Sequence, residues 1–311
     1  MRIAVFGATS TIAKDFILSL AQKSNYELSL YARRPDVVKS WLLTKAQLDK
    51  YEVFDFNEFD SSKQFDAIIN FVGTGNPAQG VIAGSSILDT TLKYDDLVLA
   101  YLRDHSECRY IFLSSGAAYG SNFDSPVTLE SKAIIAVNNL KPHDWYAVAK
   151  LYAESRHRSL PHLAIYDVRV FNYVSCTQDM SARFLITDIL RAIQSNTTLY
   201  TSLDYVVRDF MHPIDFCHLV IALLTSPATN TVVDCYSRAP IDKHTLLIEM
   251  GEKFGLKYET TQSTVTVNAT GHKNFYYSLN TRAAEFGFKP SLTSLEGIFQ
   301  ETEKFLGTPS V

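Results

Sequence analysis

The 311-residue sequence has few cysteines and no cysteine pair of the kind that binds metal. The four cysteines are Cys108, Cys176, Cys217 and Cys235. No Cys-x-x-Cys spacing and no suitably spaced histidine accompanies them, so we expect free thiols and no metal. The sequence also lacks an apolar run near the ~20 residues that cross a bilayer. Lys14 and Asp15 interrupt the N-terminal apolar stretch before the core of a signal peptide could form. We therefore expect a cytoplasmic protein without a membrane partner.

An excess of positive charge is also missing. The formal net charge is −4, which gives no basic field for a nucleic acid, so we expect no nucleic-acid partner. With 46% hydrophobic and 20% charged residues, the composition is that of an ordinary globular protein. The length predicts one large domain or two closely joined domains.

Apolar segments of strand length alternate with helical patterns through the first half of the chain. We predict strands at residues 2–6, 27–31, 51–54, 67–71, around 110 and at 164–170. Helices are predicted after residue 10, at 90–104 and at 146–157. This alternation is typical of the α/β class, with a doubly wound parallel sheet of the Rossmann type and ligands at the carboxyl ends of its strands.

Two short segments have the chemistry of a proton-transfer site. An apolar strand ends in Ser114 and Ser115, and Tyr146 and Lys150 follow with a spacing of four residues. Side chains four apart on a helix share one face, so phenol and ammonium can face one cleft. A nearby cation lowers the pKa of a phenol from about 10. With the positive ring of a cofactor added, we expect Tyr146 to act as a general acid and base near neutrality.

The order of strand, Ser-Ser, loop and Tyr-x-x-x-Lys resembles the extended short-chain dehydrogenase/reductases, which include NAD(P)-dependent nucleotide-sugar epimerases, dehydratases and reductases. The resemblance runs from Arg2 to Phe305. It implies that Ser115 is the catalytic serine, that Tyr146 is the acid/base, and that Lys150 is its partner and a ribose ligand. It also implies a nucleotide-diphosphate sugar as substrate and a homodimer built on the two helices that flank the central strands.

The cofactor residues follow from the strand ends and from the resemblance. Strand, glycine turn and helix at residues 2–13 form a pyrophosphate cradle, although Ser10 and Ala13 replace two of the family's glycines. The turn at Arg33 and Arg34 has no acid for a ribose hydroxyl, which favours NADP over NAD. The predicted cofactor-binding residues are Gly7, Thr9, Ser10, Thr11, Ile12, Arg33, Arg34, Asp55, Phe56, Phe71, Val72, Gly73, Tyr146 and Lys150.

Two further segments resemble substrate-binding motifs of the same family. Asn172 lies in an Arg-x-x-Asn segment that reaches the sugar nucleotide, and Arg208 opens an Arg-Asp-Phe motif whose arginine binds the diphosphate. We expect Asp215 to be the N-cap of the next helix and His212 to be a packed structural residue. The predicted nucleotide-binding domain comprises residues 1–170 with 205–235 returning to it, and residues 171–204 and 236–311 form a smaller substrate-binding part.

The sequence lacks side chains that two reaction types of the resembling family require. Gly116 and Ala117 stand where 4,6-dehydratases of the family have an acid pair, and the extra cysteine and histidine of 3,5-epimerising reductases are missing. A 4-keto reductase acting on an NDP-4-keto-deoxyhexose with NADP is favoured by the arginine turn. A 4-epimerase that retains NAD is the alternative. A non-catalytic dinucleotide-binding regulator is disfavoured by the presence of Ser115, Tyr146 and Lys150 together.

Overall fold

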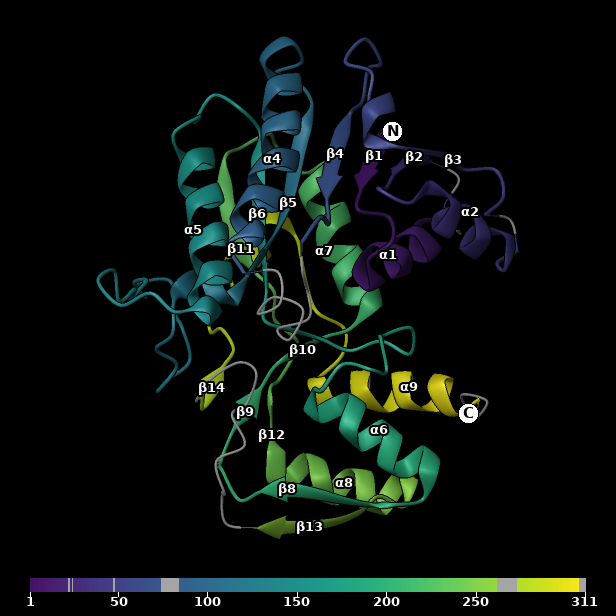
Figure 1. Cartoon of the computed structure of the whole chain (residues 1–311), viewed down its shortest axis with the longest axis vertical. Helices are drawn as coiled ribbons and strands as arrows, with labels where there is room; N and C mark the ends of the chain where they lie inside the picture. The colour runs from purple at the N-terminus through teal and green to yellow at the C-terminus, as the bar shows by residue number, and fades with distance from the viewer. Residues whose placement is uncertain (22, 24, 47, 74–83, 262–272, 308–311) are drawn as a thin grey trace.

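The fold is centred on a seven-stranded parallel sheet (Figure 1). The computed structural model describes residues 1–21, 23, 25–46, 48–73, 84–261 and 273–307. The sheet order is β11-β6-β5-β4-β1-β2-β3. These strands are β1 (Arg2–Phe6), β2 (Glu27–Tyr31), β3 (Glu52–Phe54), β4 (Ala67–Asn70), β5 (Arg109–Ser115), β6 (Ile165–Val170) and β11 (Thr231–Asp234). The predicted α/β fold with a doubly wound parallel sheet is confirmed.

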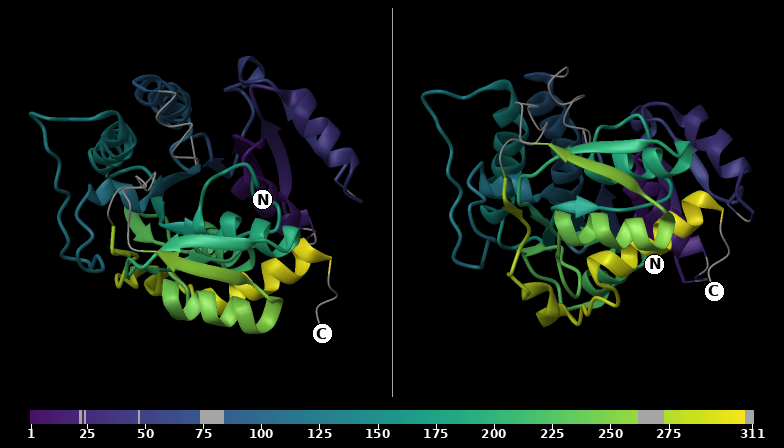
Figure 2. Two further views of the ribbon diagram at one scale, coloured as in Figure 1. Left: turned by 60° about the horizontal axis from the view of Figure 1, so that its bottom comes forward. Right: turned by 90° about the horizontal axis from the view of Figure 1, so that it is seen from below.

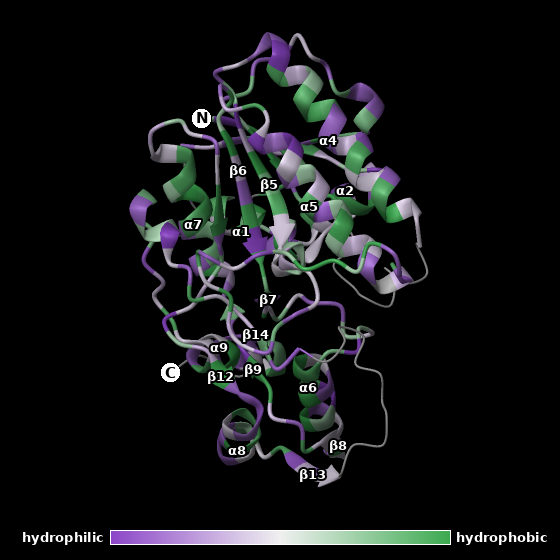
Figure 3. Ribbon diagram, turned by 90° about the vertical axis from the view of Figure 1, so that its left-hand side faces the viewer, coloured by the Kyte–Doolittle hydropathy of each residue, from purple (hydrophilic) through white to green (hydrophobic). Residues whose placement is uncertain are grey.

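Helices cover both faces of the sheet, which explains why its strands are nearly continuous apolar runs. One hydrophobic cluster joins the sheet to α1 (Thr11–Ala21), α2 (Pro35–Leu43) and α7 (Pro213–Thr225). A second cluster joins it to α4 (Ser86–Asp104) and α5 (Trp145–Arg158). In Figure 3 the middle of β5 has hydrophobic colour, which gives way to a paler carboxyl end, and β6 carries hydrophilic colour within its length. The paler end of β5 lies where parallel-sheet proteins bind ligands.

A smaller C-terminal part lies beyond the carboxyl ends of the strands (Figures 1 and 2). Its helices are α6 (Leu185–Ser195), α8 (Lys243–Phe254) and α9 (Ser294–Leu306), which share a separate hydrophobic cluster. Its short strands are β8 (Thr198–Ser202), β12 (Ile241–Asp242) and β13 (Lys257–Thr261).

Short strands connect the two parts. β7 (Asn172–Tyr173) pairs with β10 (Phe210–Met211), and β9 (Val207–Arg208) pairs with β12 and with β14 (Phe275–Tyr276). Four 3-10 turns, η1 (Phe56–Glu58), η2 (Gly116–Tyr119), η3 (Pro142–Asp144) and η4 (Arg282–Phe286), complete the elements of the described residues.

The prediction for the start of α7 is wrong. Asp215 is not the N-cap, because the helix begins one turn earlier with Pro213 in its first turn and His212 as the cap. Proline has the backbone angle of a first helical residue and no N–H to satisfy there, so it favours this earlier start. The His212 Nδ1 atom accepts a hydrogen bond from the Ile214 N–H at 3.2 Å. Asp215 instead accepts hydrogen bonds from the backbone N–H groups of Ser291 and Leu292.

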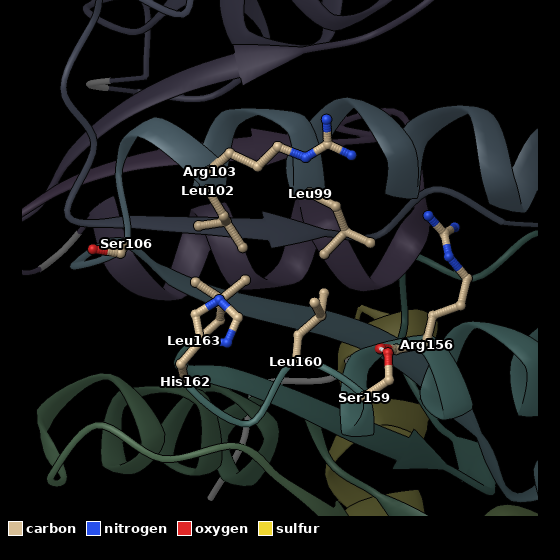
Figure 4. Close-up of a pocket in the computed structure, with 9 residues that line it drawn as sticks. All are labelled: Leu99, Leu102, Arg103, Ser106, Arg156, Ser159, Leu160, His162 and Leu163. Carbon is tan, nitrogen blue, oxygen red and sulfur yellow. Dashed lines mark hydrogen bonds between the residues drawn. The ribbon is translucent and has the colours of Figure 1, made fainter.

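A surface hollow lies between α4 and the end of α5, on the outer side of the sheet (Figure 4). Leu99 and Leu102 of α4 face Leu160 and Leu163 of the segment that follows α5. None of the predicted cofactor or substrate residues lines this hollow. No helix of the described part of the chain is long and apolar enough to cross a membrane.

Candidate active site

The catalytic serine of the prediction lies at the carboxyl end of the central strand β5. Ser115 also caps η2, and its Oγ atom accepts a hydrogen bond from the Ala117 N–H at 3.2 Å. The glycine between them is required by packing, because a Cβ atom on Gly116 would lie 2.3 Å from the ring of Phe171. The hydrogen bond to Ser115 and the packing of Phe171 on Gly116 hold the end of β5 in place, and Ser115 is buried there.

Tyr146 and Lys150 lie on one face of α5, as their spacing predicts. The Lys150 Nζ atom donates a hydrogen bond to the Leu113 carbonyl oxygen at 2.7 Å and lies 5.8 Å from the centre of the Tyr146 ring. The Tyr146 hydroxyl also forms a hydrogen bond with the Ser115 side chain. Ser115, Tyr146 and Lys150 therefore lie together at the end of β5.

Burial dominates the electrostatics of Tyr146 and Lys150. Burial raises the pKa of the Tyr146 phenol, and the hydrogen bond with Ser115 only partly opposes it. In the chain alone, desolvation therefore outweighs the groups that favour the phenolate, and a lowered pKa with the cofactor's positive ring added stays a prediction. Burial also lowers the pKa of Lys150 to about 8, while Glu154 and other nearby carboxylates act to raise it. The pKa of Lys150 therefore lies about one unit above neutral pH.

A second tyrosine reaches the same serine from the C-terminal half of the chain. Tyr276 on β14 is buried, and its hydroxyl oxygen lies 3.4 Å from Ser115 Oγ. Burial keeps the pKa of this phenol well above its ordinary value, so it remains protonated. Sequence analysis missed Tyr276 because Phe275-Tyr276-Tyr277 has no motif that sets one aromatic residue apart.

A buried ion pair links α5 to the strand ends. Glu154 accepts hydrogen bonds from Ser114 Oγ at 2.5 Å and from the Arg169 Nε atom at 3.0 Å. Arg169 lies over the Tyr119 ring, 4.4 Å from its centre. The sequence held a signal for Glu154, because Tyr146, Lys150 and Glu154 recur every four residues on one helix. Glu154 therefore positions α5 against β5 and β6.

The turn between β1 and α1 fits a dinucleotide pyrophosphate. Gly7 has a φ angle of +79°, and a Cβ atom there would lie 2.9 Å from the Val72 nitrogen. Ser10 accepts a hydrogen bond from the Ala13 N–H and so caps α1. Thr9, Thr11 and Ile12 belong to the same turn and first helical residues, where free backbone N–H groups bind anions.

The segment that follows β4 lies close to both this turn and Lys150. Phe71, Val72 and Gly73 follow β4, and a Cβ atom on Gly73 would lie 3.5 Å from Lys150 Nζ. A glycine here leaves room beside the lysine. The next residues of the predicted turn, Thr74 and Gly75, lie outside the described residues.

The predicted adenine-end residues lie after the neighbouring strands. Arg33 and Arg34 are exposed after β2, and Arg34 is the N-cap residue of α2. Asp55 follows β3 and caps η1 by accepting a hydrogen bond from the Asn57 N–H. The Phe56 ring packs on Tyr94, with ring centres 4.3 Å apart. These residues follow β2 and β3, which lie at the edge of the sheet away from β5.

The predicted substrate residues lie on the strands that connect the two parts. The Asn172 side-chain nitrogen donates to the carbonyl oxygens of Asp209 and Tyr276. Arg208 is paired in register with Tyr276, and its Nη1 atom donates to the carbonyl oxygens of Val207 and Asn274.

His212 and Cys176 both have structural contacts with Glu301. His212 is buried and its Nε2 atom lies 2.9 Å from Glu301 Oε1, as expected of a packed histidine. Cys176 is a free, half-buried thiol whose pKa burial raises to about 11. Within the described residues, no group of three or more histidine, cysteine, aspartate or glutamate side chains is arranged to hold a metal.

Comparison with curated proteins found a relative of the chain. The curated UDP-glucose 4-epimerase 4 of Oryza sativa subsp. japonica is 25% identical over 243 residues, which are 68% of this chain and 62% of that protein. The chain therefore spans less than two thirds of that relative's length.

Solved structures share the fold. A UDP-N-acetylglucosamine 4-epimerase of Methanobrevibacter ruminantium has a TM-score of 0.80 at 16% identity, over 98% of this chain and 97% of its own. A mutant of the Bacillus cereus UDP-glucuronic acid 4-epimerase, in complex with a fluorinated UDP-sugar and NAD, has a TM-score of 0.78 at 16% identity over 99% of both chains. The model of the NAD dependent epimerase/dehydratase family matches residues 3–236, which is more than half of the sequence, and the chain belongs to this family.

Proposed function

We propose that the protein is an NAD(P)-dependent oxidoreductase of nucleotide-diphosphate sugars, and that 4-epimerisation is its reaction. The observation that carries the proposal is the convergence of Ser115, Tyr146 and Lys150 at the end of β5, beside a glycine turn of the dinucleotide type. The named relatives, which are 4-epimerases, add support for the reaction.

The residues divide the work as follows. Tyr146 accepts the proton of a sugar hydroxyl and returns it, and the Ser115 hydroxyl holds the same oxygen by a hydrogen bond. Lys150 favours the phenolate by its charge, which opposes the effect of burial on Tyr146. The nicotinamide, when bound, supplies the hydride-transfer chemistry. Arg208 is proposed to bind the substrate diphosphate, and Asn172 to lie against the sugar nucleotide.

The cofactor would lie along the strand ends. Gly7, Thr9, Ser10, Thr11 and Ile12 would hold its pyrophosphate at the α1 N-terminus. Asp55 and Phe56 would contact the adenine, and Phe71, Val72 and Gly73 would border its path to Lys150.

A 4-keto reductase acting on an NDP-4-keto-deoxyhexose is the second candidate, and one observation favours it. The turn after β2 contains Arg33 and Arg34, both exposed, and no acid. Such a turn suits the 2′-phosphate of NADP, which reductases release after each turnover. The nucleotide that copurifies separates the two: tightly held NAD supports the epimerase, and preferential filling by NADPH supports the reductase.

The test of the shared chemistry is Tyr146→Phe, with Tyr152→Phe as the control. Tyr152 is on the same helix and is 50% exposed. Removing the Tyr146 hydroxyl should lower kcat about 100-fold or more while cofactor affinity stays within a few-fold. The assays are interconversion of UDP-glucose and UDP-galactose and titration of NAD and NADPH by fluorescence. Unchanged turnover in Tyr146→Phe, or loss of cofactor binding along with turnover, would contradict the assigned role.

We also propose a homodimer and a two-part organisation. The outer faces of α4 and α5, beside the hollow of Figure 4, would form the dimer contact. Residues 1–170 with 205–235 would form the nucleotide-binding domain, because β11 pairs with β6 and α7 packs with α1. Residues 171–204 and 236–311 would form the substrate-binding part. Sedimentation of the intact chain tests the dimer.

A further inference from the structure

We propose that Lys273 and Arg208 together form an anion-binding subsite beside the catalytic serine, and that it takes an anionic group of the bound nucleotide sugar. The group is either a phosphate of the diphosphate or a carboxylate on the sugar, since both present oxygens to these cations. The inference rests on the proposed function and adds a residue that no sequence motif indicates.

The two cations are placed by adjacent backbone. Arg208 on β9 is in register with Tyr276 on β14, and Lys273 lies two residues before β14. The Arg208 guanidinium donates to the carbonyl oxygen of Asn274 at 3.2 Å, which brings it to the segment that bears Lys273. Both side chains are half-buried.

Lys273 also points toward the catalytic centre. Its Nζ atom lies 4.5 Å from the centre of the Tyr276 ring and 4.9 Å from that of Phe123. The hydroxyl of that same tyrosine is 3.4 Å from Ser115 Oγ. A single aromatic side chain therefore separates the ammonium from the serine of the reaction.

The described residues only partly offset the charges of this pair, since the Asp144 carboxylate is near enough to act on Lys273. Among the residues that the structure describes, no carboxylate forms an ion pair with Lys273 or Arg208. The undescribed segments 74–83 and 262–272 contain no aspartate or glutamate, so they supply no carboxylate side chain.

Each of the two cations also disfavours the charged form of the other. Burial and the charge of Arg208 lower the pKa of Lys273 to about 8, and Asp144 opposes this only in part. Burial lowers the pKa of Arg208 to about 10. Two adjacent, partly desolvated cations are costly unless an anion binds between them, and this is the usual electrostatic character of phosphate and carboxylate sites.

The test measures ligand binding to the full-length protein by isothermal titration. The variants are Lys273→Met, which keeps the apolar stem against both rings, and Lys273→Arg, which keeps the charge. Lys289→Met is the control, because Lys289 is an exposed lysine in the segment that follows η4. The ligands are uridine, UDP, UDP-glucose and UDP-glucuronate, with the thymidine series in their place if wild-type protein binds it more tightly.

We expect Lys273→Met to weaken binding about tenfold or more, as loss of a charge-assisted hydrogen bond does, and Lys273→Arg to restore it. An equal loss for UDP, UDP-glucose and UDP-glucuronate, with uridine unaffected, assigns the subsite to the diphosphate. A loss confined to UDP-glucuronate assigns it to a sugar carboxylate. Unchanged binding of every ligand by a folded Lys273→Met protein overturns this inference alone. Wild-type protein that binds no nucleotide sugar overturns the proposed function as well.

Discussion

His157 should be positively charged in the folded protein and should make stability depend on pH. Its side chain is fully buried, with Nδ1 at 2.6 Å from Asp167 Oδ1 and Nε2 at 2.8 Å from Asp95 Oδ1. Burial lowers its pKa, but the two carboxylates outweigh burial and raise it from 6.5 to about 9. The other polar groups at these carboxylates are Tyr110, Arg156 and Arg158.

The raised pKa gives the sign and size of the effect. A histidine with a higher pKa in the folded state stabilises the protein fully below pH 6.5, and this stabilisation is lost as the pH rises to about 9. At about 1.4 kcal/mol per pH unit, protonated His157 contributes about 3 kcal/mol to the free energy of unfolding.

The perturbation is His157→Gln, measured by urea unfolding at several pH values between 6 and 9.5. The difference in unfolding free energy between wild type and variant should shrink by about 3 kcal/mol across this range. Comparison with the variant removes the titration of Lys150 and Lys273, which both proteins share. His218→Gln is the control, because the His218 side chain is 51% exposed. A difference that is the same at both ends of the range would show that His157 is neutral when folded, and would refute the argument.

Three further predictions concern the site. Arg33→Asp should shift the ratio of NADP to NAD affinity toward NAD by about tenfold, measured by cofactor titration, and an unchanged ratio would remove the case for NADP. Tyr276→Phe should lower kcat by about three- to tenfold, because its hydroxyl lies 3.4 Å from Ser115 Oγ, and unchanged kinetics would mean that it does not orient the serine. Glu154→Gln should destabilise the protein by about 3 kcal/mol in urea unfolding, since Arg169 loses the nearer of its two buried carboxylates and keeps Asp234 at 3.6 Å; an unaltered midpoint would rule this out.

Local sequence patterns predicted most of the strand frame. β1 and β2 begin and end at the predicted residues, and α5 differs from its prediction by one residue at each end. These elements have strong apolar periodicity and clear flanking turns, which short-range physics determines. The start of α7 was misplaced by three residues, because an aspartate in the first turn resembles a cap unless the preceding proline is given its full weight.

Some residues of the candidate site could be predicted from the sequence, and others could not. Tyr146 and Lys150 could be predicted to face one site because they are four residues apart on one helix, and Ser115 could be predicted from the resemblance of its strand end to the family's motif. Tyr276 and Lys273 could not, because they approach Ser115 from more than 150 residues away along the chain through the pairing of β14 with β9. No local pattern encodes such a pairing.

The sequence by itself therefore determined the doubly wound frame, the glycine turn after its first strand, the serines at the end of β5, and the tyrosine and lysine on one face of α5. Only the tertiary structure decided which residues of the C-terminal half enter that site, and which direction the pKa of Tyr146 takes. The physical reason is that spacing along a helix or strand is fixed by backbone geometry, whereas burial and long-range contact depend on how separate elements pack.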